Sequence, residues 1–306
     1  MMMLEEEEKV KQDHCDHESR ATSSSIIDCG QLPRELSDQE MIKLRNDTQI
    51  LSKFKRDKLE REAKKNWDLF YKRNKNHFFK DRHWTQREFQ ELCGINNRPV
   101  EEMSGKQRYS FETLLEVGCG VGNFIFPLLE SGCNYFVYAC DFSPVAIDIL
   151  KSNPAYDEKR CRAFVADITC PQFLSTWSNE RMSDHTNVDI ISLIFVLSAI
   201  SPEKMGQAVE NLFNILSPGG IVLFRDYGLY DYAMIRFSEG HKIGDNFYVR
   251  QDGTRAFYFT KDYVSNLFIS KGFQLISNDY INKVTTNKKE GISVPRIFIQ
   301  SKFYKP

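Results

Sequence analysis

Glycines and carboxylates at the ends of apolar runs are the residues of this sequence best suited to chemistry. Gly118, Gly120 and Gly122 alternate directly after one such run. Glycine allows a backbone to turn tightly and to approach a nucleotide-like ligand within van der Waals range. The dinucleotide-binding fingerprint would need its last glycine one place later, where Asn123 stands. The segment therefore predicts a loop for a different nucleoside-like ligand, although an ordinary strand-to-helix turn has a similar pattern.

Two carboxylates follow the next two apolar runs. Asp141 closes the second run and Asp167 closes the third. The first could accept hydrogen bonds from two ribose hydroxyls, and the second from an adenine amino group. Either carboxylate alone would more often be a helix N-cap. Their order behind the glycine loop, followed by the turn Leu216-Ser-Pro-Gly-Gly220, favours a nucleoside-binding site.

The elements that must position these residues alternate short apolar runs with helix-length segments. The runs are 113–117, 136–140, 163–165, 188–197 and 221–224, with two further strand candidates at 274–280 and 296–303. Such alternation predicts an α/β domain with a doubly wound, mostly parallel sheet that helices cover on both faces.

Charge is distributed unevenly along the chain. The net charge is −1 over 306 residues, but residues 1–50 carry 6 basic and 12 acidic side chains. Residues 53–87 carry 13 basic and 5 acidic side chains, a net charge of +8, and residues 281–306 carry a net charge of +5. Two basic segments in a near-neutral protein favour a localised anionic partner, with a solvated helix face as the alternative.

We expect three segments in the chain. Residues 1–45 contain an acidic run and no Phe, Tyr or Trp, so we expect a disordered acidic tail. Residues 46–105 form a basic, aromatic-rich extension in which apolar residues recur at helical spacing. A polar stretch with Gly and Pro ends this extension, and residues 106–306 form the α/β domain.

Composition excludes several classes of protein. A hydrophobic content of 41% with 23 Phe supports a sizeable core, and no apolar run reaches the roughly 18 residues of a membrane span. The acidic first residues do not resemble a signal peptide, so the 8 Cys are expected to be reduced thiols. We therefore expect a cytoplasmic protein, with the nucleus left open as a second compartment. The crowded set His14, Cys15 and His17 has no matching second cluster, so we expect no metal site.

The glycine loop, with Glu116 two residues before Gly118, resembles motif I of class I methyltransferases, which bind S-adenosylmethionine. Longer segments are similar to the eukaryotic tRNA 3-methylcytidine methyltransferases, among them Asn66-Trp-Asp-Leu-Phe-Tyr-Lys-Arg-Asn74, Phe78-Phe-Lys-Asp-Arg-His-Trp84, Cys140-Asp-Phe-Ser-Pro144 and Leu223-Phe-Arg-Asp-Tyr-Gly-Leu-Tyr230. The similarity covers residues 47–306 and implies a Rossmann-like class I fold, S-adenosylmethionine as cofactor and methylation of N3 of cytidine 32 in the tRNA anticodon loop. Within the family, the chain is most similar to the member that acts on serine tRNAs, which implies seryl-tRNA synthetase as a partner.

The resemblance also implies which residues hold the cofactor. Trp67 and Tyr71 lie four residues apart on one helical face and would cover it. The residues that would line its site are Gly118, Gly120, Asp141, Asp167, Ile168 and Ile194. Without the resemblance, the two aromatic residues would be assigned to the core.

Methylation at N3 of cytosine requires little acid–base chemistry. N3 has a free lone pair, so the site must position the base, exclude water and offset a developing positive charge. Asp226 follows the fifth strand and could accept from the cytosine amino group, and Tyr227 and Tyr230 could stack on a flipped base. Arg225 completes this candidate catalytic set. A hydrogen-bonded packing cluster is the alternative for these residues.

Basic residues of the extension and of the domain are the candidates for RNA contacts, with surface solvation as the alternative: Lys64, Lys65, Lys72, Arg73, Arg82, Arg250 and Arg296. Two other functions stay open. One is a methyltransferase for a protein or a small molecule, which would not require the basic segments. The other is a catalytically silent adaptor that binds RNA or a synthetase, although the intact glycine and carboxylate set speaks against it.

Overall fold

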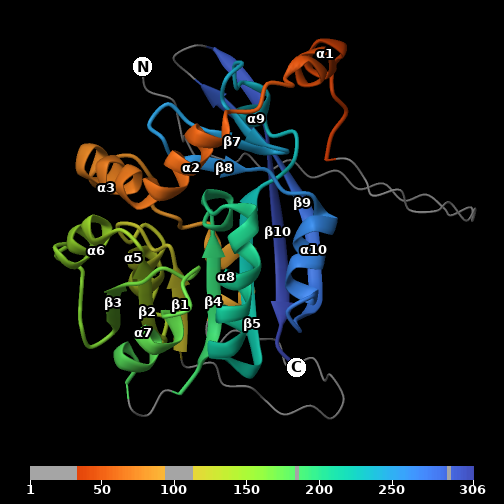
Figure 1. The fold of residues 1–306 in the computed structure, drawn as a ribbon. Helices are drawn as coiled ribbons and strands as arrows, with labels where there is room; N and C mark the ends of the chain where they lie inside the picture. Colours follow the sequence, from red (N-terminus) through yellow and green to blue (C-terminus); the bar gives the residue numbers. More distant parts are fainter. Residues whose placement is uncertain (1–32, 94–112, 183–185, 288–290) are drawn as a thin grey trace, which may run out of the picture.

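A seven-stranded sheet forms the centre of the computed structural model, which describes residues 33–93, 113–182, 186–287 and 291–306 (Figure 1). Its strand order is β3-β2-β1-β4-β5-β10-β9. The strands are β1 (Thr113–Val117), β2 (Phe136–Asp141), β3 (Cys161–Val165), β4 (Val188–Ile194), β5 (Leu216–Tyr227), β9 (Gln274–Asn287) and β10 (Ile292–Tyr304). Neighbours from β3 to β5 pair in parallel, whereas β10 lies antiparallel to both β5 and β9. The predicted doubly wound, mostly parallel sheet is confirmed.

Helices cover both faces of the sheet because the strands at its centre are apolar on both sides. Every residue of β1 is buried: Leu115 packs into a core with α7 (Phe173–Glu180), α8 (Pro202–Ile215) and α10 (Lys261–Ile269). Its neighbour Leu114 packs into a second core on the opposite face. That core also contains residues of α5 (Ile125–Glu130), α6 (Pro144–Lys151) and the short helix η1 (Gln90–Cys93), which follows α4 (Thr85–Glu88).

The strands β3, β5, β9 and β10 are longer than predicted, and β4 is shorter. β4 stops at Ile194, and the predicted last residues turn instead into the short helix η3 (Leu197–Ala199). β5 begins at Leu216, within the predicted turn, and its pairing jumps from Val188–Leu216 to Ile190–Ile221. The residues between are therefore a bulge in the strand, and the positive φ of Gly219 (+78°) belongs to it.

The basic extension forms α2 (Lys53–Arg61) and α3 (Ala63–Asn74), which Figure 1 shows together with the short strands β7 (Phe247–Val249) and β8 (Arg255–Phe257) over one end of the large sheet. Two contacts fix α3 to the domain: the Ser143 hydroxyl donates to Asp68 at 2.5 Å, and the Asn66 amide donates to the Gly253 carbonyl at 3.0 Å. The expected boundary at residue 105 lies outside the described residues.

A second, three-stranded antiparallel sheet and a short helix were not anticipated from the sequence. The sheet contains β6 (Lys242–Gly244), β7 (Phe247–Val249) and β8 (Arg255–Phe257), and α9 (Tyr232–Ile235) precedes it. Elements of three or four residues are too short to show a hydrophobic period, so no pattern marks them.

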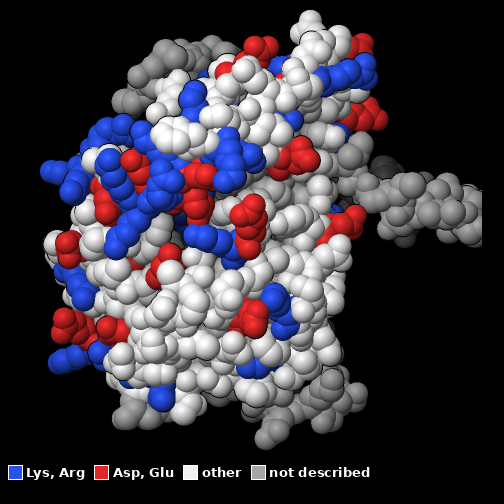
Figure 2. Space-filling view, in the orientation of Figure 1, with Lys and Arg blue, Asp and Glu red and all other residues white. Residues whose placement is uncertain are grey.

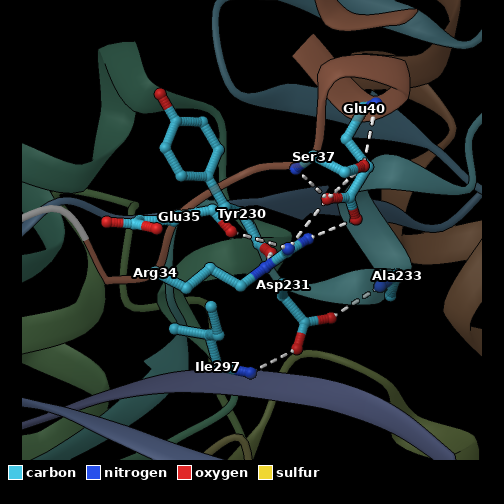
Figure 3. A network of polar contacts seen from close by, with 8 residues as sticks. All are labelled: Arg34, Glu35, Ser37, Glu40, Tyr230, Asp231, Ala233 and Ile297. Atoms are coloured by element: carbon cyan, nitrogen blue, oxygen red, sulfur yellow. Dashed lines mark hydrogen bonds and ion pairs between the residues drawn. The ribbon is translucent and has the colours of Figure 1, made fainter.

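The expectation of disorder through residue 45 is wrong for residues 33–45. The helix α1 (Asp38–Asn46) begins at a capping box, in which Ser37 and Glu40 satisfy each other's backbone N–H groups. Arg34 pairs with Glu40 at 2.6 Å, so an acidic residue of the expected tail has a fixed partner (Figure 3). The rest of the tail, including His14, Cys15 and His17, lies outside the described residues.

Candidate active site

The glycine loop joins β1 to α5 in a backbone conformation that other residues adopt with strain. Gly118 and Gly120 have φ values of +62° and +53°. A Cβ on Gly118 would lie 2.6 Å from a methyl carbon of Val196, and a Cβ on Gly120 would lie 2.9 Å from the Tyr71 hydroxyl. The two glycines therefore let the loop pass close to the segment after β4 and to α3.

Asp141 stands at the end of β2 with both carboxylate oxygens engaged. Oδ2 accepts from the Gly120 N–H at 3.0 Å, and Oδ1 accepts from the Ser143 N–H at 2.9 Å. The side chain is only 5% exposed, and this burial raises the pKa of Asp141 to about 6 despite the two backbone donors. Each oxygen keeps a further lone pair, so the carboxylate can accept hydroxyl groups of a ligand.

Asp167 follows β3 and is held by its own turn. Its Oδ1 accepts from the backbone N–H of Thr169 at 2.8 Å and from the hydroxyl of the same residue at 2.7 Å. The next residue, Ile168, is buried. Both predicted residues lie beside the same cavity as Asp141.

That cavity, which we call the glycine-loop cavity, has a volume of about 540 Å³. Six of the eight predicted cofactor residues line it: Trp67, Tyr71, Gly118, Asp141, Asp167 and Ile168. Trp67 and Tyr71 reach it from α3, with ring centroids 5.8 Å apart. Glu60 of α2 also lines it and forms ion pairs with Arg255 and Lys204, so the basic extension forms one wall of the cavity.

Two predicted cofactor residues are placed differently. Gly120 lines the neighbouring cavity described below. Ile194 is 1% exposed, belongs to the core and lines neither cavity. The two residues that follow it, Phe195 and Val196, line the glycine-loop cavity in its place. Phe195 has a φ of +59°, which is unusual for an aromatic residue.

A second cavity of about 1040 Å³ adjoins the first, and we call it the basic cavity. The two share Trp67, Tyr71, Gly118 and Phe195 among their walls. Four predicted arginines line it: Arg82, Arg225, Arg250 and Arg296. Five further basic residues that sequence reasoning did not select line it as well: Lys80, Arg87, Arg236, Arg255 and Lys283. Lys80, Arg87 and Lys283 lie in the two basic segments of the sequence, which was the one signal that could have found them. Arg236 and Arg255 lie outside those segments and had no such signal.

Two of these arginines are held in place by acids and aromatic rings. Arg225 is almost fully buried, donates to Glu88 at 3.3 Å and to Gln300 at 2.8 Å, and lies 4.4 Å from the Trp84 ring centroid. Arg296 pairs with Asp231 at 2.9 Å. Their guanidinium groups are therefore fixed before any ligand arrives.

The basic cavity also contains the buried carboxyl group of Glu116. Its Oε2 has no hydrogen-bond partner among the described residues. Burial raises the pKa of Glu116 well above the ordinary value, and the nearby charge of Arg82 opposes that rise. A buried acceptor without a partner fits a ligand that brings a donor or a positive charge to this position.

The predicted catalytic residues are only partly brought together. Arg225 and Tyr227 line the basic cavity, and the Tyr227 ring lies 5.1 Å from that of Phe195. Asp226 lies on the opposite side of β5, fully buried, and accepts from the backbone N–H groups of Ser198 and Tyr227 at 2.9 Å each. It lines neither cavity, and its expected contact with the base stays a prediction. Burial raises its pKa to about 6.

Among the described residues, Tyr230 lines neither cavity. Its ring packs beside a small core that contains Tyr227 and Tyr258, and its backbone carbonyl accepts from Arg34 at 3.0 Å. Figure 3 shows the ring directed away from Asp231 and Arg34. The expected stacking on a base is therefore not supported.

The basic residues predicted on α3 lie on its exposed side. Lys64, Lys65, Lys72 and Arg73 are all exposed, and Figure 2 shows Lys and Arg gathered on the face above α2 and α3. Lys64 also lines the glycine-loop cavity. Arg73 lies 3.6 Å from Asp252, a residue of the basic cavity, so this surface continues to the cavity mouth.

The described part of the chain was searched for metal-binding clusters and for membrane-spanning helices. Within it, no three His, Cys, Asp or Glu side chains converge so as to hold a metal ion. The helices of that same part are all too short or too polar to cross a membrane.

Comparisons with known proteins agree with this site. A model described as a methyltransferase domain matches residues 82–278. The tRNA N(3)-cytidine methyltransferase METTL6 of Homo sapiens is 52% identical over 276 residues, which cover 89% of this chain and 91% of that protein. METTL2 of Xenopus tropicalis, also a tRNA N(3)-cytidine methyltransferase, is 39% identical and covers 96% of this chain and 93% of that protein.

A solved structure supports the fold. The S-adenosylmethionine-dependent methyltransferase of Anabaena variabilis superposes with a TM-score of 0.55 at 13% identity, covering 80% of this chain and 95% of that one. The glycine loop, Asp141 and the unpartnered Glu116 oxygen fit S-adenosylmethionine as the cofactor. The chain therefore belongs to the tRNA N(3)-cytidine methyltransferases, within the class I methyltransferase fold.

Proposed function

We propose that the protein transfers a methyl group from S-adenosylmethionine to N3 of cytidine 32 in the anticodon loop of serine tRNAs. One observation carries the proposal: the glycine-loop cavity adjoins a larger basic cavity, and Gly118 and Phe195 line both. A donor in the first cavity and an RNA base in the second would therefore meet. The names of the relatives supply the reaction, and the resemblance of the sequence supplies the position and the tRNA.

The residues of the glycine-loop cavity would hold the donor. Bound S-adenosylmethionine supplies an electrophilic methyl group on a positively charged sulfur. Asp141 offers carboxylate oxygens for the ribose hydroxyls, and Asp167 offers an acceptor to the adenine. The Trp67 and Tyr71 rings cover the cavity from α3 and keep water out of it.

The basic cavity would hold the acceptor base. N3 of cytosine uses its own lone pair, so the protein has no proton to remove and must mainly orient the base. Tyr227 and Phe195 present aromatic rings 5.1 Å apart at the boundary of the two cavities, where a flipped base could stack. Asp226 acts indirectly in this proposal: it holds the backbone of Ser198, which lines the cavity.

The surroundings of the site extend the proposal to partners and location. The exposed lysines and Arg73 of α3 would contact tRNA phosphates outside the cavity. We further propose seryl-tRNA synthetase as the partner that presents serine tRNAs, and the cytoplasm as the place of action, with the nucleus as a second compartment to examine. The support for these proposals is the family resemblance.

The test is methyl transfer to individual purified tRNAs with and without seryl-tRNA synthetase, followed by nucleoside mass spectrometry. We expect 3-methylcytidine in serine tRNA and none in a matched transcript that carries uridine at position 32. A methylated protein or small molecule without methylated tRNA would refute the proposal. Binding of S-adenosylmethionine without any transfer would instead support a silent adaptor.

A further inference from the structure

Residues 33–51, which we call the N-terminal strap, are tied across the domain at two separate places. The Asn282 amide of β9 donates to the Pro33 carbonyl at 3.2 Å. Lys242 of β6 donates from its ammonium group to the Asp47 carbonyl at 2.8 Å, and its own carbonyl accepts from the Leu51 N–H at 2.8 Å. The strap is therefore part of the folded domain, although neither described cavity is lined by it.

Arg34 contacts the turn that leads into α9, whose residues line the basic cavity (Figure 3). Its Nε donates to the Tyr230 carbonyl at 3.0 Å. Its two terminal nitrogens donate to the two oxygens of Glu40 at 2.9 and 2.6 Å, so the guanidinium group is fixed in a forked ion pair. The arginine side chain is 17% exposed, and its charge and hydrogen bonds lower the pKa of Glu40 to about 2.

The carbonyl that Arg34 holds belongs to a strained turn. Tyr230 has a φ of +63°, a conformation that costs free energy for a bulky residue and persists only when its surroundings impose it. The next residue, Asp231, is fully buried. Its carboxylate accepts from the Ala233 N–H and the Ile297 N–H at 2.8 Å each and from Arg296 Nε at 2.9 Å.

The Tyr230–Asp231 turn therefore holds two segments that form walls of the basic cavity. One wall is α9 and the residue after it, from which Tyr232, Ala233 and Arg236 face the cavity. The other wall is β10, from which Arg296 faces it. A change in the turn would move both walls, while the glycine-loop cavity contains none of these residues.

We propose that Arg34 is a positioning residue for tRNA binding, which acts from outside the site by holding the Tyr230–Asp231 turn beneath the walls of the basic cavity. The inference rests on the proposed function, in which that cavity receives the tRNA. It assigns a role to a segment that composition alone marks as part of a tail.

The test compares Arg34→Ala with Arg45→Ala in the full chain. Arg45 is an exposed residue of the strap with the same charge, so its removal controls for electrostatic attraction alone. We expect Arg34→Ala to weaken direct tRNA binding about ten-fold, as for the loss of one charged hydrogen bond, and Arg45→Ala to change it less than about two-fold. Binding of S-adenosylmethionine should remain within about two-fold in both variants. Equal effects of the two variants on tRNA binding, or no effect of either, would overturn the inference.

A second variant separates positioning from general destabilisation. Glycine adopts positive φ without strain, so in a Tyr230→Gly background the turn should depend less on Arg34. We expect the effect of Arg34→Ala on tRNA binding to shrink to less than about three-fold in that background, and an undiminished effect would refute the mechanism. Glu40→Gln, which leaves Arg34 present but unclamped, covers the case in which Arg34→Ala fails to fold and should give a smaller loss in the same direction.

The proposed function and this inference can fail separately. Methyl transfer by the wild-type protein tests the proposed function alone. The ratio of tRNA dissociation constants between variants and wild type tests the role of Arg34 and needs no turnover.

Discussion

Asp141→Asn is the substitution that examines the cofactor site most directly. In the wild-type protein both carboxylate oxygens accept backbone N–H groups, from Gly120 and Ser143. An asparagine has one acceptor oxygen, so its NH₂ group would face one of these two donors. The variant also loses the negative charge that receives the ribose hydroxyls. The loss of a hydrogen bond to a charged group corresponds to about 1.5–3 kcal/mol, or roughly ten- to hundred-fold in the dissociation constant of S-adenosylmethionine.

Isothermal titration calorimetry with S-adenosylmethionine measures this effect. Asp148→Asn is the matched control, because it removes the same charge from an exposed position on the adjoining helix α6. The pH dependence gives a second readout. Burial raises the pKa of Asp141 to about 6, so wild-type affinity should fall as the pH drops through 6, whereas the variant should lose this dependence. Wild-type affinity in Asp141→Asn at pH 7.5 would refute the assignment of the loop and of this carboxylate.

Two further predictions concern the acceptor side. Asp226→Asn should leave S-adenosylmethionine affinity unchanged, lower the turnover number and cost about 1–3 kcal/mol of stability in urea unfolding, because one of its two backbone donors loses its acceptor. The pKa of Asp226 is raised to about 6 from 3.8, so ionisation of this carboxyl group destabilises the fold. The stability of the wild-type protein should therefore fall as the pH rises from about 4 to about 6, and that of the variant should fall less steeply. Equal pH dependence of stability in the two proteins would contradict this. A third variant changes four exposed basic residues of α3 to Gln: Lys64, Lys65, Lys72 and Arg73. It should preserve cofactor binding and make the salt dependence of tRNA binding shallower. The log–log slope should change by about 0.7–0.9 for each phosphate that is no longer neutralised. We expect the slope to change by the equivalent of about two phosphates, since Lys65 and Arg73 already lie near Glu62 and Asp252, and an unchanged slope would remove this surface from the tRNA interface.

The sheet and the cofactor side of the site were predictable because they follow local rules. Glycines after β1 and carboxylates after β2 and β3 occupy the edge where parallel strands end, and this edge is visible in the apolar runs alone. Asp141, Asp167 and Gly118 accordingly line one cavity. The roles of Trp67 and Tyr71 came only from the family resemblance, since a helical aromatic pair is otherwise typical of a core.

The placement of Asp226 outside both cavities has a simple physical origin. Side chains of a strand point alternately to its two sides, so Arg225 and Tyr227 face the basic cavity and Asp226 between them faces the interior. Because β5 extends as far as Tyr227, this alternation separates Asp226 from its two neighbours. At the end of β4 the case is different: the positive φ of Phe195 turns the chain, and no residue type at that position signals it.

The strap and the basic cavity could not be derived from local patterns. Arg34 meets Tyr230 and Asn66 meets Gly253 across long separations in the sequence, and nothing near either partner indicates the other. The prediction of disorder before residue 45 relied on composition averaged over the tail. The capping box at Ser37 and Glu40 was the local signal that this average concealed.

The position of β10 has a consequence for the order in which the protein is assembled. β10 is inserted between β5 and β9, both of which precede it in the chain, and it carries Arg296 and Phe298 into the basic cavity. All residues that line the glycine-loop cavity leave the ribosome earlier. A nascent chain can therefore complete its cofactor half before its tRNA half, and until β10 arrives it exposes two unpaired strand edges. Truncation before Ile292 should accordingly cause aggregation as well as loss of tRNA binding.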